Sequence, residues 1–311
     1  MKKRIFLSFL AVIIFVLSSC IPAKKPAEDH TPSEPECVTV WLVEKETAPT
    51  GKITEYTYNE HGQEVQAVTR GEYGEIVSTV TSEYDENLNC VRKTMVTSTY
   101  PQGLVTEYVY DASGRVTEEK YPLNPKKFVY DAEGRQIEQT TFYEGTENKS
   151  YCEQTVYSED GSFVRTRTQH KKNGEVSSVE TSRFDKNGRL IDRVTENRSQ
   201  NTKKTLTGKH VLDDALRVLS SEGVREDGVI EWRYEYTYTE DGRVESVVDS
   251  YATGARNTTA YSYDKNGNLT TINYFSFSGQ VSSRTYTYME VKVPLADAAK
   301  ITAPATYAEL P

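Results

Sequence analysis

The side chains best suited to catalysis are histidines and acidic pairs. The chain has four histidines, His30, His61, His170 and His210. Their spacing matches no zinc, protease or lyase motif. The adjacent acids Asp213-Asp214 and Glu159-Asp160 could share a substrate only if both side chains faced it, but neighbouring residues on a strand point to opposite faces. We interpret these acids as turn residues, and we expect no catalytic residue and no enzymatic activity.

The sequence also gives little support for a metal site or for several disulfides. Asp264 to Asn268 resembles the first half of a calcium-binding loop, but the bidentate acid expected later in such a loop is absent. Beyond Cys20, the cysteines are Cys37, Cys90 and Cys152, whose spacings match no zinc motif and whose number permits one disulfide at most. We expect no metal or cofactor, and buried or half-buried thiols.

Tyrosine is the residue type with two possible roles. The chain has 22 Tyr against 9 Phe and 2 Trp, and Tyr suits both half-buried strand surfaces and binding surfaces. One interpretation is a packed structural face. The other is an amphipathic groove for glycan or peptide, whose candidate residues are Tyr108, Tyr234, Tyr236, Tyr261 and Tyr286.

Composition narrows the class of protein. The 311 residues are 36 % hydrophobic and 27 % charged, and the mean hydropathy is -0.65. These values exclude a polytopic membrane protein, while the apolar content suffices for a folded core. The aromatic content favours β structure.

The N-terminus has the features of an export signal. Lys2, Lys3 and Arg4 precede an apolar run from 5 to 17, which is short for a membrane span. The following Leu17-Ser18-Ser19-Cys20 resembles a bacterial lipoprotein box. This resemblance implies cleavage before Cys20, lipid modification such as palmitate on Cys20, and, with Ile21 next, an outer-membrane location in a Gram-negative cell.

Residues 21–36 contain four prolines and few apolar side chains, which predicts an extended tether. Removal of residues 1–19 leaves 34 of the 37 basic residues against 46 acidic residues, a net charge of -12. Nucleic acid and anionic lipid surfaces need a basic partner surface, so this charge argues against both.

One short pattern returns along almost the whole chain beyond the tether. Its clean copies are YDASGRV at 110–116, YDAEGRQI at 130–137, FDKNGRL at 184–190, YTEDGRV at 238–244 and YDKNGNL at 263–269. Degenerate copies begin at Tyr58, Tyr84, Tyr157 and Leu212, and those at 84 and 212 lack the turn glycine. The copies recur about every 26 residues, which indicates a repeat protein.

Each copy has the composition of a tight turn. Asp at the start and Gly three residues later suit a type I turn followed by a left-handed residue, which makes a β-hairpin with a bulge. The structural residues expected in these turns are Tyr110, Asp111, Gly114, Arg115, Tyr130, Asp131, Gly134, Arg135, Phe184, Asp185, Gly188, Arg189, Tyr238, Gly242, Arg243, Tyr263, Asp264 and Gly267. A second set of turn signals lies midway between copies, at 71–74, 101–103, 145–148, 173–174, 227–228, 253–254 and 278–279.

These signals predict two antiparallel strands per repeat, with the leading Tyr opposite the apolar residue after the turn, as in Tyr110 with Val116, Tyr238 with Val244 and Tyr263 with Leu269. Pro122 and Pro125 predict a shortened hairpin. Because open sheets rarely exceed ~10 strands without curling, we expect an all-β fold of antiparallel hairpin repeats that forms a long curled or spiralling strip. The expected divisions are a signal peptide at 1–19, lipidated Cys and tether at 20–36, repeats at 37–293 and a cap or tail at 294–311.

The motif Tyr-Asp-x-x-Gly-Arg followed by Val, Leu or Ile resembles the YD repeat, also called the RHS repeat, of bacterial surface and toxin proteins. The resemblance covers roughly residues 50–290. In large members of that family the repeats form a β strip that spirals into a hollow shell, so the resemblance implies a β-strip fold and no active site. With about nine repeats, we do not expect a fully closed shell here. Since no candidate toxin domain follows the last repeat, we do not expect an intact toxin.

The sequence therefore predicts a lipid-anchored binding or interaction scaffold at the bacterial cell envelope, periplasmic or surface-facing. Its expected partners are the membrane, through the lipid, and a protein or glycan ligand. Two alternatives remain: a carrier or protective companion in an RHS-type toxin or contact-dependent system, and, less favoured, a carbohydrate-active enzyme.

Overall fold

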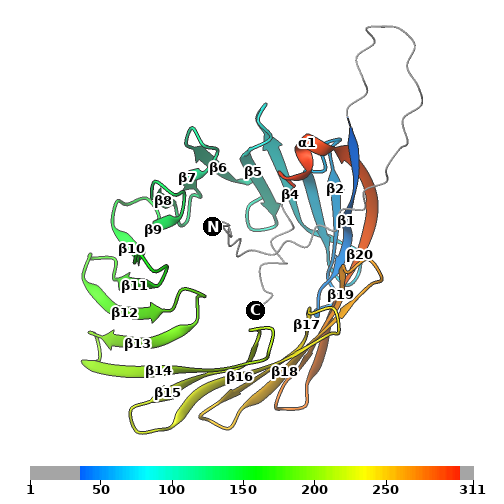
Figure 1. Cartoon of the computed structure of the whole chain (residues 1–311). Helices are drawn as coiled ribbons and strands as arrows, with labels where there is room; N and C mark the ends of the chain where they lie inside the picture. The colour runs from blue at the N-terminus through cyan, green and yellow to red at the C-terminus, as the bar shows by residue number, and fades with distance from the viewer. Residues whose placement is uncertain (1–35, 302–311) are drawn as a thin grey trace, which may run out of the picture. The chain divides into compact units, whose positions relative to one another are not determined.

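The computed structural model describes residues 36–301, which form 20 β-strands and one short α-helix (Figure 1). Short turns connect the strands as antiparallel hairpins, so the predicted all-β fold of antiparallel hairpin repeats is confirmed. The expected signal peptide, Cys20 and the tether up to residue 35 lie outside the described residues. So do residues 302–311 of the expected cap.

The first ten strands are β1 (Cys37–Thr47), β2 (Ile53–Tyr58), β3 (Glu64–Arg70), β4 (Ile76–Tyr84), β5 (Cys90–Thr97), β6 (Leu104–Tyr110), β7 (Val116–Lys120), β8 (Lys126–Tyr130), β9 (Gln136–Phe142) and β10 (Lys149–Tyr157). The others are β11 (Phe163–His170), β12 (Val176–Phe184), β13 (Leu190–Asn197), β14 (Thr202–Leu212), β15 (Val218–Arg225), β16 (Ile230–Tyr238), β17 (Val244–Tyr251), β18 (Arg256–Tyr263), β19 (Leu269–Phe275) and β20 (Val281–Pro294), followed by helix α1 (Leu295–Ala298). The described residues belong to two compact units. Unit 1 holds residues 36–82, 262–272 and 283–301, and unit 2 holds residues 83–261 and 273–282.

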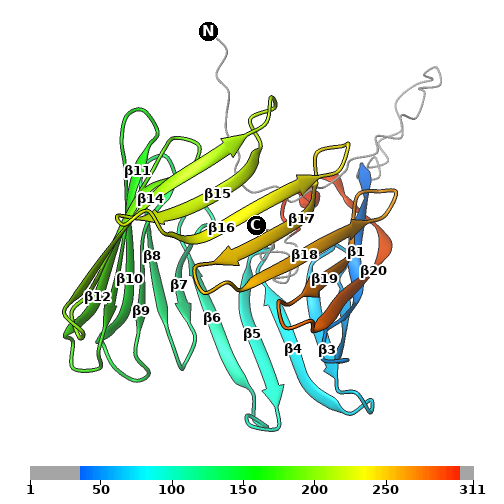
Figure 2. The ribbon, with the colours of Figure 1, turned by 90° about the horizontal axis from the view of Figure 1, so that it is seen from below.

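Within unit 2, each strand pairs with its neighbours in the chain, and Figure 2 shows β10, β11 and β12 side by side. The hairpin of β7 and β8 is the short one that the prolines predict, with two residue pairs, Glu118 with Lys127 and Glu119 with Lys126. Tyr110 lies opposite Val116, and Tyr238 lies opposite Val244, as the pattern predicts. A register shift just before each of these tyrosines marks a β-bulge.

The turn after β6 shows why the motif needs its residue types. Gly114 has a φ of 75°, and its N–H donates to the Asp111 carbonyl at 3.0 Å. The Asp111 carboxylate accepts bonds from the backbone N–H of Ser113 and of Arg115, and from the Arg115 Nε at 2.7 Å. The Arg115 backbone N–H, followed by its guanidinium, lowers the pKa of Asp111. The aspartate thus holds both the backbone of the turn and the arginine side chain.

The two motif turns without glycine adopt the same conformation as the motif turns that contain it. Leu88 and Leu216 have φ values of 62° and 64° in the position that glycine holds elsewhere. The N–H of Leu216 donates to the Asp213 carbonyl at 3.0 Å, and Asp213 binds Arg217 as Asp111 binds Arg115. In the turn at Leu88, Asp85 accepts bonds from the backbone N–H and the Nδ2 of Asn89. An aspartate bonded to the residue after the turn therefore accompanies the conformation that leucine disfavours sterically.

The turn between β13 and β14 is not among the predicted turns. Strands β13 and β14 are joined at 198–201, where Asn201 has a φ of 51°. Asn is the non-glycine residue that most readily adopts this conformation, so its presence between two alternating segments is the signal that was missed.

A second set of contacts joins each hairpin to the next. The Arg217 guanidinium lies over the Tyr238 ring, 4.6 Å from its centroid, and the Tyr238 hydroxyl donates to the Val218 carbonyl at 2.8 Å. Arg115 covers Tyr130 in the same way at 4.7 Å, and the Tyr130 hydroxyl donates to the Val116 carbonyl at 2.8 Å. We call this arrangement the Arg-Tyr ladder. In each step of the ladder, the arginine of one turn contacts the leading tyrosine of the following repeat.

Where the leading tyrosine is missing, another group takes its place. Phe184 has no hydroxyl and stacks instead on Phe163, the residue after the preceding turn, with ring centroids 4.7 Å apart. In the repeat led by Leu212, His210 Nε2 lies 2.8 Å from the Leu190 carbonyl, the atom that a tyrosine hydroxyl would reach. The ladder therefore tolerates substitution as long as the carbonyl or the ring gains a partner.

Unit 1 contains a hydrophobic cluster formed by Val38, Val40, Leu42, Val293 and Ala298. β1 pairs with β20 along most of its length and with β2 at its end. The stretch after β20 forms α1, whose Ala298 is buried in this cluster. The His61 Nδ1 and an Asp297 carboxylate oxygen are 2.8 Å apart, which links α1 to the turn before β3. Burial of apolar side chains and one polar contact thus hold the helix against the strands.

Replacing Gly188 with Val tests the turn conformation. Gly188 has a φ of 79°, and an added Cβ would meet no atom within 4 Å, so any loss reflects backbone strain alone. We expect the free energy of unfolding, measured by urea titration, to fall by about 1–2 kcal/mol. Lys186→Val in the same turn, where φ is not positive, is the control. Equal losses in both variants would contradict the assignment.

Replacing Leu216 with Gly should stabilise the protein, which is the opposite of the effect expected for Gly188→Val. Leu216 is 77 % exposed, so little buried surface is lost when left-handed strain is relieved. We expect the free energy of unfolding to rise by up to about 1 kcal/mol. Leu219→Gly, within β15, should lower it, because glycine weakens a strand. A destabilised Leu216→Gly protein would show that the leucine is not strained.

Replacing Tyr238 with Phe tests the ladder. The change removes the hydroxyl bonded to the Val218 carbonyl and keeps the ring under Arg217. We expect a loss of about 0.5–1.5 kcal/mol in the free energy of unfolding. Tyr73→Phe, at a ring that is 90 % exposed, should leave stability unchanged. A neutral Tyr238→Phe would mean that the hydroxyl contributes nothing to the contact between hairpins.

Candidate functional site

The tyrosines considered as a binding face lie in different environments. Tyr108, Tyr234 and Tyr236 are half-buried. Tyr261 and Tyr286 are buried, with 8 % and 4 % of their surface exposed, so these two rings offer little surface to a ligand and fit the packed structural face. Strand alternation put both on the aromatic face, but it did not reveal that the neighbouring packing covers them.

The pKa values of two of these tyrosines also reflect burial. Desolvation, followed by the charge of Glu119, raises the pKa of Tyr108 to about 12. Desolvation, followed by the neighbouring tyrosines, raises the pKa of Tyr236. Both hydroxyls therefore stay neutral at physiological pH and act as hydrogen-bond groups rather than as acids or bases.

The turn residues of the motif lie where the repeat pattern predicts them. Asp131 and Asp185 bind Arg135 and Arg189, as Asp111 binds Arg115. In the turn after Tyr238, Thr239 replaces the aspartate and its hydroxyl accepts the Arg243 N–H at 3.1 Å. The glycines Gly134, Gly188, Gly242 and Gly267 all have positive φ. The aspartate, arginine and threonine side chains of the motif are therefore engaged in contacts within their own turns.

The other reactive groups singled out in the sequence do not converge. Asp160 and Asp213 accept turn hydrogen bonds, as does Asp264 from Asn266 and Asn268. Cys152 is buried and Cys90 is half-buried, but Cys37 is exposed, which corrects the expectation for that thiol. Over residues 36–301, no group of three or more His, Cys, Asp or Glu side chains is placed to hold a metal ion.

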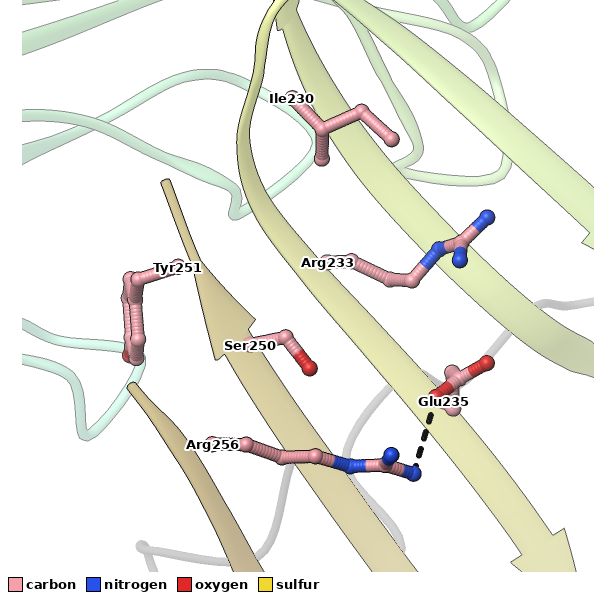
Figure 3. A pocket seen from close by; sticks show the side chains of 6 residues that line it. All are labelled: Ile230, Arg233, Glu235, Ser250, Tyr251 and Arg256. Atoms are coloured by element: carbon pink, nitrogen blue, oxygen red, sulfur yellow. Dashed lines mark ion pairs between the residues drawn. The ribbon is translucent and has the colours of Figure 1, made fainter. Parts of the chain in front are cut away.

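The pocket shown in Figure 3 lies in unit 2, on β16, β17 and β18, and has a volume of about 370 Å³. Its lining residues are Ile230, Arg233, Glu235, Ser250, Tyr251 and Arg256. Strand pairing places Arg233 opposite Ser250 and Ser250 opposite Arg256, so these three polar residues form a row across three strands. Because Arg233 and Glu235 alternate with Tyr234 and Tyr236, they belong to the face opposite the aromatic one.

Charged pairs set the electrostatics of this pocket. The Arg233 Nε donates to Glu222 at 2.6 Å, and Arg256 lies 3.7 Å from Glu235 (Figure 3). A hydrogen bond with Tyr234, followed by burial, raises the pKa of Tyr251 to about 12. Two arginines, a carboxylate and the Ser250 hydroxyl share this face, whereas the Tyr251 hydroxyl bonds to Tyr234 on the aromatic face. Such groups can bind a polar ligand through charge and hydrogen bonds, and this pocket is the candidate binding site among the described residues.

Sequence reasoning missed this pocket. The alternation in β16 shows that Arg233 and Glu235 share a face, but the partner of Ser250 depends on the register of β17 with β18. The turn at 251–255, closed by the bond from the Tyr251 N–H to the Ala255 carbonyl, sets that register. The detectable signal was a polar face rich in arginine and glutamate behind the tyrosines.

Comparisons with known proteins give one family. Residues 84–125 match the RHS Repeat family model. No curated protein matches the chain. No helix within residues 36–301 is long and apolar enough to cross a membrane.

The solved structures that match this chain have low sequence identity and low TM-scores. The crystal structure of TcdB2-TccC3-Cdc42 is 15 % identical, with a TM-score of 0.33, and the match covers 79 % of this chain and 15 % of that one. A porin-like protein from Bacteroides vulgatus ATCC 8482 is 11 % identical, with a TM-score of 0.34, and the match covers 80 % of this chain and 99 % of that one. The chain thus spans about 15 % of the length of the TcdB2-TccC3 protein, and neither likeness bears on function.

The family match and the hairpins agree. The matched residues 84–125 include the turns at Asp85 and Asp111, and the same turn returns through both units. The repeat is therefore the building block of the described residues, which form an all-β scaffold of antiparallel hairpins, and residues 84–125 are similar to the RHS, or YD, repeat.

Proposed function

We propose that the protein is a lipid-anchored scaffold of the bacterial cell envelope, which binds a partner and catalyses no reaction. The observation that carries this proposal is the Arg-Tyr ladder. It engages the charged and hydroxyl groups of the motif in contacts between hairpins, as Arg217 and Tyr238 show. Side chains that are engaged in these contacts stabilise the fold and do not serve as catalytic groups.

The anchor is proposed from the sequence. Cys20 follows an apolar run and two small residues, and residues 21–36 provide a proline-containing link before β1 begins at Cys37. A lipid on Cys20 inserts its chains into the bilayer and leaves the repeats in the aqueous phase. An outer-membrane location follows if the host is Gram-negative.

The net charge supports an envelope partner other than nucleic acid. From Cys20 onward the chain has 34 basic and 46 acidic residues, a net charge of -12, which repels phosphate backbones. A protein or glycan ligand is compatible with this charge.

Replacing Cys20 with Ala tests the anchor. In cells of a bacterial host that expresses the full chain, we expect the wild-type protein in the membrane fraction and the C20A variant in the soluble fraction, because the lipid attachment atom is gone. Labelling with a palmitate analogue should mark the wild type and leave C20A unlabelled. The control is Cys37→Ala, which should stay in the membrane. Continued membrane retention of C20A would contradict the proposal.

A further inference from the structure

Four side chains on the aromatic face of β16 and β17 form an acidic aromatic cluster, made of Trp232, Tyr234, Asp249 and Tyr251. Trp232 lies opposite Tyr251 in the antiparallel register, and Tyr234 lies opposite Asp249. Residues directly opposite each other on one face have Cβ atoms about 4.5–5.5 Å apart, so the four side chains are neighbours. The Trp232 and Tyr234 ring centroids are 5.4 Å apart, and Tyr251 is 41 % exposed. Three aromatic rings thus lie next to one carboxylate.

A glycine on the neighbouring strand makes room for the indole. Gly223 on β15 lies opposite Trp232, and a Cβ at this glycine would come within 2.4 Å of the indole. Glycine in a strand interior weakens the strand, but it permits close approach of another group to the backbone. The backbone of β15 therefore holds the Trp232 ring in position beside Tyr234.

The carboxylate of Asp249 has neutral hydrogen-bond partners but no cationic one. The Asn257 Nδ2 donates to an Asp249 carboxylate oxygen at 2.7 Å, and the Tyr251 hydroxyl also interacts with Asp249. Within residues 36–301, no lysine, arginine or histidine forms an ion pair with Asp249. The motif aspartates differ, since Asp111 binds the guanidinium of Arg115. Asp249 therefore places a negative charge without a counter-ion among the rings.

The charges and the rings of the cluster both favour a cation. The face of an aromatic ring attracts a cation that lies within about 6 Å of the ring centroid. A carboxylate adds to this attraction, and the net charge of -12 from Cys20 onward has the same sign. A neutral or anionic ligand gains nothing from these charges.

The existing hydrogen bonds decide which kind of cation fits. Because the Asp249 carboxylate already interacts with Asn257 and Tyr251, the cluster offers negative charge more than free acceptors. A primary ammonium and a sugar both bring several donors that need acceptors, whereas a quaternary ammonium has no N–H to satisfy. A metal ion needs several oxygen ligands, and over the described part of the chain no group of three or more His, Cys, Asp or Glu side chains is placed to provide them.

We propose that the acidic aromatic cluster binds a quaternary ammonium group, such as the trimethylammonium of choline. The methyl groups pack on the Trp232 and Tyr251 rings, and the Asp249 carboxylate balances the positive charge. This inference rests on the proposed binding function. It names a class of ligand other than the protein or glycan expected there.

The test is calorimetric titration of the full chain with choline, after purification in a maltoside detergent, which contains no ammonium group. The control ligand is the uncharged carbon analogue of choline, in which carbon replaces the ammonium nitrogen. Ethanolamine provides a primary ammonium of the same charge. We expect choline to bind at least ten-fold more tightly than either of these ligands, because only choline combines the charge with a surface free of donors.

Two variants locate the site. Asp249→Asn removes the charge at nearly constant shape and should weaken choline binding at least ten-fold. The matched control is Glu245→Gln, which removes one charge from an exposed position of the same strand and should leave choline binding unchanged. In the Trp41→Phe variant, Trp232 is the only tryptophan of the chain, so choline should change its fluorescence with the dissociation constant that calorimetry gives.

A third variant keeps the test decisive if Asp249→Asn does not fold. Tyr251→Leu changes a partly exposed side chain and removes one ring, so it should weaken choline binding at least three-fold. Tyr73→Leu, at a ring that is 90 % exposed in unit 1, should not weaken it.

Four results would overturn the inference. They are the absence of choline binding, equal affinity for choline and its carbon analogue, tighter binding of ethanolamine than of choline, and equal losses in each variant and its control. None of these alters where the protein resides in the cell. Release of the wild type from membranes, in the fractionation described for Cys20, would instead defeat the anchored scaffold and leave the ligand result standing.

Discussion

The hairpins depend on one backbone constraint, a residue with positive φ at the fourth position of each motif turn. Gly114 satisfies it without strain, and Leu216 satisfies it because Asp213 and Arg217 hold the surrounding turn. The constraint fixes the bulge before the leading tyrosine and therefore the register of the two strands. Since a slip of one residue would move every side chain to the other face, this turn also decides which face is aromatic.

The Arg-Tyr ladder repeats the same side-chain contact between each hairpin and the next. A turn arginine is held by its own aspartate and lies over the next tyrosine, whose hydroxyl reaches a carbonyl just after that turn. More than one residue type can make this contact. Phe184 makes it by stacking on Phe163, and His210 makes it through its ring nitrogen. This explains how degenerate repeats keep the geometry of clean ones.

The two faces of the hairpins consequently have different roles in unit 2. On the aromatic face, the leading tyrosines are half-buried and their hydroxyls are bonded, as for Tyr110 and Tyr130. On the opposite face of β16, polar and charged side chains lie in a cross-strand row of Arg233, Ser250 and Arg256, and the arginines pair with Glu222 and Glu235. The polar face is therefore held by ion pairs, and the aromatic face by ring packing and hydroxyl–carbonyl bonds.

The sequence by itself determined the repeats, the hairpins between neighbouring strands and most of the turns, because these follow from interactions that are local in the chain. Asp111, Gly114 and Arg115 bond to one another, so their spacing alone predicts their contacts. The tertiary structure decided what depends on contacts between hairpins. It buried Tyr261 and Tyr286, placed His210 against Leu190, and brought Arg233, Ser250 and Arg256 into one row. These outcomes depend on the register across several strands, which each bulge shifts, and no local pattern encodes that sum.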